Sequence, residues 1–104
     1  MRVIHKNQNS GKTDTIIREA EKNQSYVVCQ SRRHVEHVAE RARELGVSIA
    51  LPITFHEFLK GQFSSHRGAG QISFVVDDLD ILLAEISRGV PIKAISLTRE
   101  KNGD

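Results

Sequence analysis

Short apolar, β-branched runs alternate with longer amphipathic stretches along this chain, and this alternation limits its possible folds more than any other feature. The two most apolar runs, residues 26–29 and 72–76, are nearly continuous, which is typical of strands that are buried on both faces. Strands separated by helices are joined by crossover connections and pair in parallel. The pattern therefore predicts a three-layer α/β fold with a small, mostly parallel sheet of four to five strands.

Local signals indicate where the helices begin and end. Ser31 is a suitable N-cap for a helix whose apolar residues recur at three- and four-residue spacing up to Gly46. Thr54 is followed three residues later by Glu57, which is the spacing of a capping box. The expected helices cover residues 12–22, 32–45, 55–60 and 79–88, the last with Leu82, Leu83 and Ile86 facing inward. The expected strands are residues 2–5, 26–29, 47–51, 72–76 and 92–97.

Length, charge and cysteine content exclude several classes of protein. The 104 residues suffice for one compact domain, which we expect to cover residues 1–98, followed by a polar tail at residues 99–104. No apolar run approaches the roughly 20 residues that a membrane helix needs, and no secretory signal is visible at the start. Lys and Arg number 15 against 13 Asp and Glu, an excess too small to indicate nucleic acid binding by itself. Because Cys29 is the single cysteine, no internal disulfide can form, and we expect a cytoplasmic protein.

The strongest chemical signal is the run N-S-G-K-T at residues 9–13, between the first expected strand and the first expected helix. A loop that leads into a helix directs backbone N–H groups and the positive end of the helix dipole at a bound phosphate. Gly11 permits close approach of the backbone, and Lys12 supplies a positive charge for the phosphates. The hydroxyl of Thr13 is a hard oxygen ligand of the kind that Mg²⁺ prefers.

Residues 6–13, K-N-Q-N-S-G-K-T, resemble the G-x-x-x-x-G-K-[ST] pattern of P-loop NTPases. The pattern departs at its first glycine, where this chain has Lys6; looser versions of the loop occur in helicase-like and phage packaging ATPases. The resemblance implies that the chain binds ATP or another nucleoside triphosphate together with Mg²⁺. The residues implied to hold the nucleotide are Asn7, Gln8, Asn9, Ser10, Gly11, Lys12 and Thr13.

An acidic pair at the end of the apolar run 72–76 extends the resemblance. Asp77 matches the Walker B aspartate, which implies that Asp77 holds Mg²⁺ together with Thr13. Asp78 falls where many family members carry the glutamate that polarises the attacking water, so it is the implied catalytic residue. Aspartate is one methylene shorter, and about 1 Å of misplacement can cost on the order of 100-fold in rate. The alternative is an acidic cluster at the start of the helix near residue 79, with Asp80 as its cap.

Two further segments resemble parts of helicase-like motors. Residues 27–33 resemble the strand-to-helix turn that faces DNA in such motors, and residues 94–98 resemble the sensor strand, whose terminal hydroxyl contacts the γ-phosphate region. A solvated helix start and a plain buried strand are the alternatives. The basic residues of the helix at 32–45 offer a face for nucleic acid or an acidic partner: Arg32, Arg33, Arg41 and Arg43. The interleaved glutamates favour intrahelical ion pairs instead: Glu36, Glu40 and Glu44.

The remaining candidates favour structural roles. His34 and His37 lie three residues apart on the same helix, but a zinc site needs three or four converging ligands, so we expect both to be surface residues. Cys29 is best explained as a small buried apolar residue. Arg67, in the glycine-rich segment 62–70, is a weak candidate for sensing phosphate.

Two hypotheses follow. The first is a small nucleotide-binding protein in which Lys12, Thr13, Asp77 and Asp78 act together, and in which a second copy or a protein partner supplies the missing arginine finger for hydrolysis. The second is a non-catalytic adaptor or inhibitor that keeps a degenerate P-loop scaffold and binds protein or nucleic acid, since fold alone does not fix function.

Overall fold

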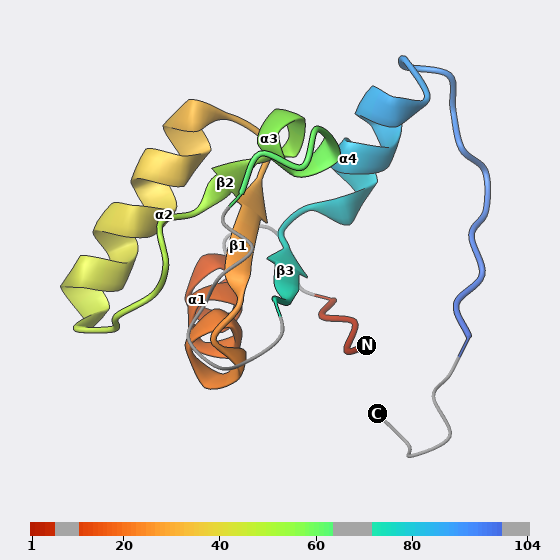
Figure 1. Ribbon diagram of the computed structural model, residues 1–104. Coiled ribbons are helices and arrows are strands. Elements are labelled where there is room, and N and C mark those ends of the chain that lie inside the picture. The colour runs from red at the N-terminus through yellow and green to blue at the C-terminus, as the bar shows by residue number, and fades with distance from the viewer. Residues whose placement is uncertain (6–10, 64–71, 99–104) are drawn as a thin grey trace.

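The chain folds into an α/β domain with a three-stranded, all-parallel sheet flanked by helices (Figure 1). The computed structural model describes residues 1–5, 11–63 and 72–98. The elements are α1 (Lys12–Asn23), β1 (Tyr26–Cys29), α2 (Arg32–Leu45), β2 (Ile53–Thr54), α3 (Phe55–Leu59), β3 (Phe74–Val76) and α4 (Leu79–Ile86). None of the described helices is long and apolar enough to cross a bilayer.

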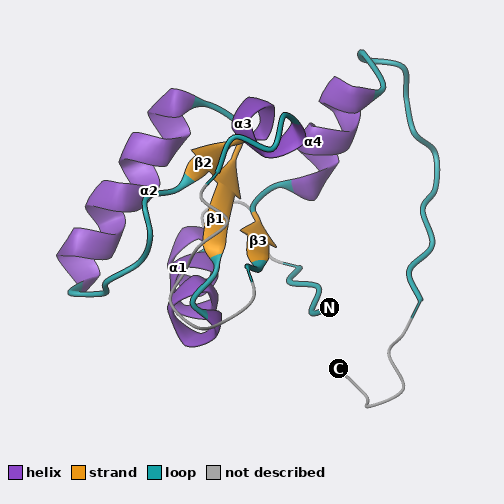
Figure 2. Ribbon diagram, viewed as in Figure 1, coloured by secondary structure: helices purple, strands orange, loops and turns teal. Residues whose placement is uncertain are grey.

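The central strand β1 pairs with β2 on one side and with β3 on the other. Val28 stands opposite Ile53 in β2 and opposite Val76 in β3. Figure 2 shows the three strands in the middle of the domain, with helices around them. Because all three strands run in parallel, their carboxyl ends lie at one edge of the sheet, and the residues that follow β1 and β3 are brought together there.

Alternate side chains of β1 enter two separate cores. Val27 and Cys29 pack with apolar residues of α1 and α2, whereas Val28 packs with Phe55 and Leu82 on the opposite face. The side chains of Val27, Val28 and Cys29 are fully buried. The prediction that this apolar run is covered on both faces is therefore confirmed.

The helix boundaries follow the local signals in the sequence. The Ser31 hydroxyl accepts a hydrogen bond from the His34 N–H at 3.2 Å, and Gly46 ends α2 in the left-handed conformation. Thr54 and Glu57 form the complete capping box that the sequence predicts. Each cap satisfies backbone N–H groups that have no partner within the helix.

Three of the five expected strands are wrong, so the described residues form a smaller sheet than the expected four to five strands. Residues 2–5, 47–51 and 92–97 contain no strand; Val47 packs into the core, and β2 begins only after Pro52. The apolar side chains of residues 92–97 are instead about half exposed on a segment that runs away from the domain (Figure 1). An apolar run becomes a strand only where another strand pairs with it, and these runs find none within the described chain.

Two smaller corrections concern α4 and the core beside it. Ile86 was expected to face inward, but it is 55% exposed, while Leu82 is buried as expected. The helix ends at Ile86, earlier than the expected boundary at residue 88. The last turn of α4 is therefore only partly covered by the described chain, with Leu83 partly buried and Ile86 exposed.

Candidate functional site

The start of α1 and the ends of β1 and β3 enclose an open pocket of about 490 Å³. The pocket brings together Lys12 and Thr13 from α1 with the acidic pair that follows β3. Its lining residues are Gly11, Lys12, Thr13, Gln30, Ser31, Arg33, His34, His37, Asp77 and Asp78. In α/β folds, ligands bind at the carboxyl ends of parallel strands, and this pocket lies at that edge of the sheet.

Gly11 gives α1 its abrupt start. Its φ of 80° lies in the left-handed region that L-residues rarely adopt, although a Cβ would meet no atom of the described residues within 4 Å. The requirement for glycine here is therefore conformational and not steric. The Gly11 carbonyl accepts hydrogen bonds from both the backbone N–H and the hydroxyl of Thr15, each at 3.1 Å. The first turn of α1, with N–H groups that no helical carbonyl can satisfy, consequently begins at the pocket wall.

Lys12 reaches across the pocket to the acidic pair. Its Nζ forms a close ion pair with Asp78 Oδ1 and lies 3.9 Å from Asp77 Oδ1. The hydrogen bond to Asp78 raises the pKa of Lys12 above its ordinary value, so the amine stays charged. The side chain is one-third exposed, which leaves its amine accessible to a ligand that enters the pocket.

Asp77 is the most unusual group of the site. Its backbone N–H continues the sheet by donating to the Val28 carbonyl at 3.0 Å, and its side chain is only 1% exposed. Neither carboxylate oxygen accepts a hydrogen bond from the described residues. A buried carboxylate without such partners is costly, and a divalent cation is a group that would satisfy it. The burial of Asp77 therefore fits a metal ligand, and Thr13 lines the same pocket.

Asp78 adopts an unusual backbone conformation at the N-cap of α4. Its φ of 57° is left-handed, and its side chain forms no capping hydrogen bond but turns to Lys12 instead. Asp80 lies in the first turn of α4 and is exposed. Asp80 thus lies where a carboxylate suits the helix dipole, as the alternative interpretation expects, although no side-chain cap hydrogen bond forms at the N-cap, Asp78. A strained conformation at a residue that faces a pocket is a common feature of functional sites.

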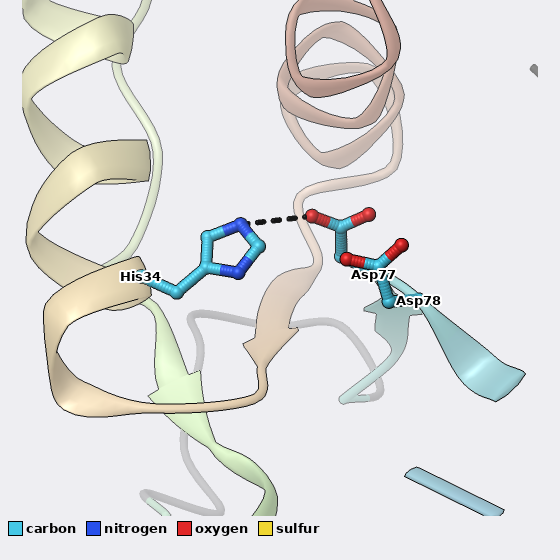
Figure 3. A group of neighbouring side chains, drawn as sticks. All are labelled: His34, Asp77 and Asp78. Carbon is cyan, nitrogen blue, oxygen red and sulfur yellow. Dashed lines mark ion pairs between the residues drawn. The ribbon is translucent and has the colours of Figure 1, made fainter. Parts of the chain in front are cut away.

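His34 was missed in the sequence analysis, which placed it on the surface. Its side chain is only 15% exposed, and its Nε2 lies 3.1 Å from Asp77 Oδ2 (Figure 3). One ligand atom each from His34, Asp77 and Asp78 lie within 4.8 Å of one another. His37, one turn further along α2, is exposed as expected. The N-cap at Ser31 was the available signal, because it places His34 in the first turn of a helix that starts beside the strand ends.

Two of the four arginines in the expected basic face form ion pairs within the chain. Arg41 holds Asp14 through two hydrogen bonds of 2.7 and 2.8 Å, which lower the pKa of that carboxyl. Arg32 lies 3.1 Å from Glu57. Arg33, by contrast, lines the pocket. A nucleic acid interface over this face thus remains a prediction, with fewer available charges than the sequence suggests.

Several expected site residues fall elsewhere. Residues 94–98, the expected sensor strand, belong to the exposed segment, and none of them lines the pocket. Burial raises the pKa of the Cys29 thiol to about 12, which agrees with its expected place in the core. The residues that lie outside the described chain are Asn7, Gln8, Asn9, Ser10 and Arg67.

Comparisons with known protein families, with curated proteins and with solved structures found no match to this chain. Its function therefore has to be argued from the geometry of the pocket and the chemistry of the side chains that line it.

Proposed function

We propose that this chain binds ATP or a related nucleoside triphosphate with Mg²⁺ in the pocket at the carboxyl ends of β1 and β3. One observation carries the proposal: Lys12 and Thr13, at the start of α1, line the same pocket as the buried Asp77, which is distant in the sequence. The arrangement resembles a P-loop NTPase-like core, in which a phosphate-binding helix start faces an acidic residue at the end of a parallel strand, and this resemblance supports the proposal. The relationship of this fold to P-loop NTPases is therefore part of the proposal.

The phosphate side of the pocket is positive. Lys12 supplies a mobile charge, and Arg33 supplies a second cationic side chain on the opposite wall, from α2. The N-terminus of α1 adds its dipole and its free N–H groups. In the proposed complex Lys12 leaves Asp78 and pairs with the phosphates, whose charge is higher than that of a single carboxylate.

The metal side of the pocket is formed by oxygen donors. Asp77 offers a buried carboxylate that accepts no hydrogen bond from the described chain, and Thr13 offers a hydroxyl. Mg²⁺ usually takes one or two protein oxygens and completes its shell with phosphate oxygens and water. The ion would neutralise charge on the phosphates, while Thr13 and Asp77 would fix its position against α1.

Hydrolysis requires more than binding. Asp78 is the proposed residue that positions the attacking water, but in this structure its carboxylate is engaged by Lys12. Release of Lys12 to the phosphates would free Asp78 at the moment that nucleotide arrives. Turnover would still depend on an arginine that a partner or a second copy supplies, so we propose nucleotide binding as the primary activity.

A thermal unfolding titration tests the proposal. A ligand at 100 times its Kd stabilises the folded state by about 2.7 kcal/mol, and each kcal/mol raises the Tm of a small domain by about 4–8 °C. ATP with Mg²⁺ should therefore raise the Tm of the wild type by about 10 °C or more. Lys12→Ala should lose this shift, measured against its own ligand-free Tm, whereas Lys22→Ala should keep it, because Lys22 is exposed at the far end of the same helix.

The outcome discriminates between the two hypotheses from the sequence. No shift in the wild type would refute nucleotide binding and would favour the adaptor or inhibitor on a P-loop scaffold. If the shift is present, phosphate release from Asp78→Asn and Asp78→Glu variants separates a binder from a hydrolase. Turnover that appears only in Asp78→Glu would identify a degenerate catalytic site.

A further inference from the structure

We propose that His34, Asp77 and Asp78 form a site for a divalent transition-metal ion, such as Zn²⁺ or Co²⁺, that binds without nucleotide. The three side chains come from the first turn of α2 and from the end of β3, and Figure 3 shows the His34 ring directed at the Asp77 carboxylate with Asp78 beside it. This site shares Asp77 and Asp78 with the proposed nucleotide site, but it does not depend on nucleotide binding.

The distances suit a shared ion. His34 Nε2 and Asp77 Oδ2 are 3.1 Å apart, and the Asp78 ligand atom lies within 4.8 Å of both. Ligands at about 2.0–2.2 Å from a tetrahedral zinc ion lie somewhat over 3 Å from one another. The His34–Asp77 pair already has this separation, so only the Asp78 side chain has to move inward.

The burial of Asp77 favours a bound cation in addition to its contacts with Lys12 Nζ at 3.9 Å and His34 Nε2 at 3.1 Å. The carboxylate is almost completely buried, yet within the described residues it accepts no hydrogen bond, and the His34 ring approaches it without hydrogen-bond geometry. A buried anion requires a paired charge or a metal to offset the loss of water. This observation is independent of the clustering of the three side chains and points to the same place.

The donor set selects the kind of metal. Imidazole nitrogen suits Zn²⁺, Co²⁺ and Ni²⁺, whereas Mg²⁺ favours ligands that are all oxygen. Two carboxylates and one neutral imidazole give three protein ligands, and such sites keep a further position open for water or substrate. The predicted order of affinity in the absence of nucleotide is therefore Zn²⁺ and Co²⁺ far above Mg²⁺.

Lys12 competes with the metal for Asp78. Its amine contacts the Asp78 carboxylate and lies 3.9 Å from Asp77, so a bound ion has to displace this positive charge. The same residue is the proposed phosphate ligand. Removing Lys12 should consequently strengthen metal binding while it abolishes the effect of nucleotide, and these opposite results separate the two proposals.

Isothermal titration of the untagged protein with Co²⁺ and with Zn²⁺, followed by the visible absorption of bound Co²⁺, tests the site. The wild type should bind one ion. His34→Ala should weaken binding by more than about 100-fold, since loss of a partner outside the coordination shell alone costs about 10- to 100-fold. His34→Gln should give the same loss with a side chain of similar length, and circular dichroism confirms that both variants are folded.

His37→Ala is the matched control, because His37 is exposed one turn further along α2 and lines the same pocket. It should keep the wild-type affinity, and Lys12→Ala should bind Co²⁺ more tightly than the wild type. The proposal is overturned if the wild type binds Co²⁺ no better than His34→Ala does, or if His37→Ala loses as much affinity as His34→Ala. The Tm shift with ATP and Mg²⁺, measured on the same variants, reports nucleotide binding separately, so failure of one proposal is distinct from failure of the other.

Discussion

Replacement of Asp77 by asparagine should make the metal-free protein more stable, although it removes a residue that we place at the centre of the site. The side chain is 1% exposed and accepts no hydrogen bond from the described chain. A buried polar group left without partners costs about 1–3 kcal/mol, and more when it is charged. An amide of the same shape has no charge to desolvate, so part of this cost disappears in Asp77→Asn.

The charges of Lys12 and Asp78 nearly cancel at Asp77, and the nearer His34 Nε2, 3.1 Å away, forms no hydrogen bond with the carboxylate. Lys12 Nζ attracts the carboxylate across 3.9 Å, which is about 4 kcal/mol at an effective dielectric constant of about 20. Asp78 repels it across 4.8 Å or less, which is at least about 3.5 kcal/mol on the same scale. Solvent around the partly exposed Lys12 reduces its attraction further. The net gain from Asp77→Asn is therefore about 1–2 kcal/mol, or a Tm higher by about 5–10 °C for a domain of this size.

Urea unfolding in a buffer that contains a chelator measures the effect. The midpoint should rise in Asp77→Asn with an unchanged slope, which reports stability and not a change in the denatured state. Asp80→Asn is the control, because Asp80 is exposed in the first turn of α4, where loss of a negative charge should destabilise by about 0.3–1 kcal/mol. A decrease of 1 kcal/mol or more in Asp77→Asn would refute the reasoning, since it would mean that the carboxylate is already satisfied without a metal.

Four further predictions concern the core and the caps. Cys29, whose thiol pKa burial raises from 9.0 to about 12, should resist thiol reagents at pH 8 until the protein unfolds. Because the pKa of the Cys29 thiol is higher in the folded than in the unfolded protein, its burial should contribute fully to stability below pH 9, and this contribution should decline as the pH rises toward 12. Rapid labelling of Cys29 in the native protein at pH 8 would contradict the burial of the thiol. Thr54→Ala should cost about 1 kcal/mol in urea unfolding through loss of the α3 cap. The hydrogen bond from the Thr54 N–H lowers the pKa of the Glu57 carboxyl below the ordinary value of 4.5. The stability that this carboxylate contributes should therefore be lost as the pH falls below 4.5. If Glu57→Gln unfolds in acid with the same pH dependence as the wild type, this prediction is wrong. Ile17→Ala, at a fully buried position of α1, should cost about 2–5 kcal/mol and Ile17→Val about 0.5–1.5 kcal/mol; equal losses in both would mean that this side chain is not packed as described.

The helices and most of their ends, though not the end of α4, were predictable because their causes are local. A cap such as Ser31 or the pair Thr54 and Glu57 acts on N–H groups two or three residues away, so the sequence contains both partners within one turn. The chemistry of the pocket was predictable in part for a related reason. Residues at a helix start and at the end of a parallel strand are brought to one edge by the α/β pattern itself, and this placed Lys12 beside the acidic pair.

Tertiary structure alone decided which apolar runs became strands and which side chains joined the site. Residues 2–5, 47–51 and 92–97 have the composition of strands, but the hydrogen bonds of a strand come from a distant segment, and no composition supplies that partner. His34 is adjacent to Asp77 because of the angle at which α2 leaves β1 and the register of β1 with β3. The sequence by itself determined the fold class, the helices and the types of residue that we propose to bind phosphate and metal. The extent of the sheet and the position of His34 beside Asp77 depend on long-range contacts, which form only when the chain folds.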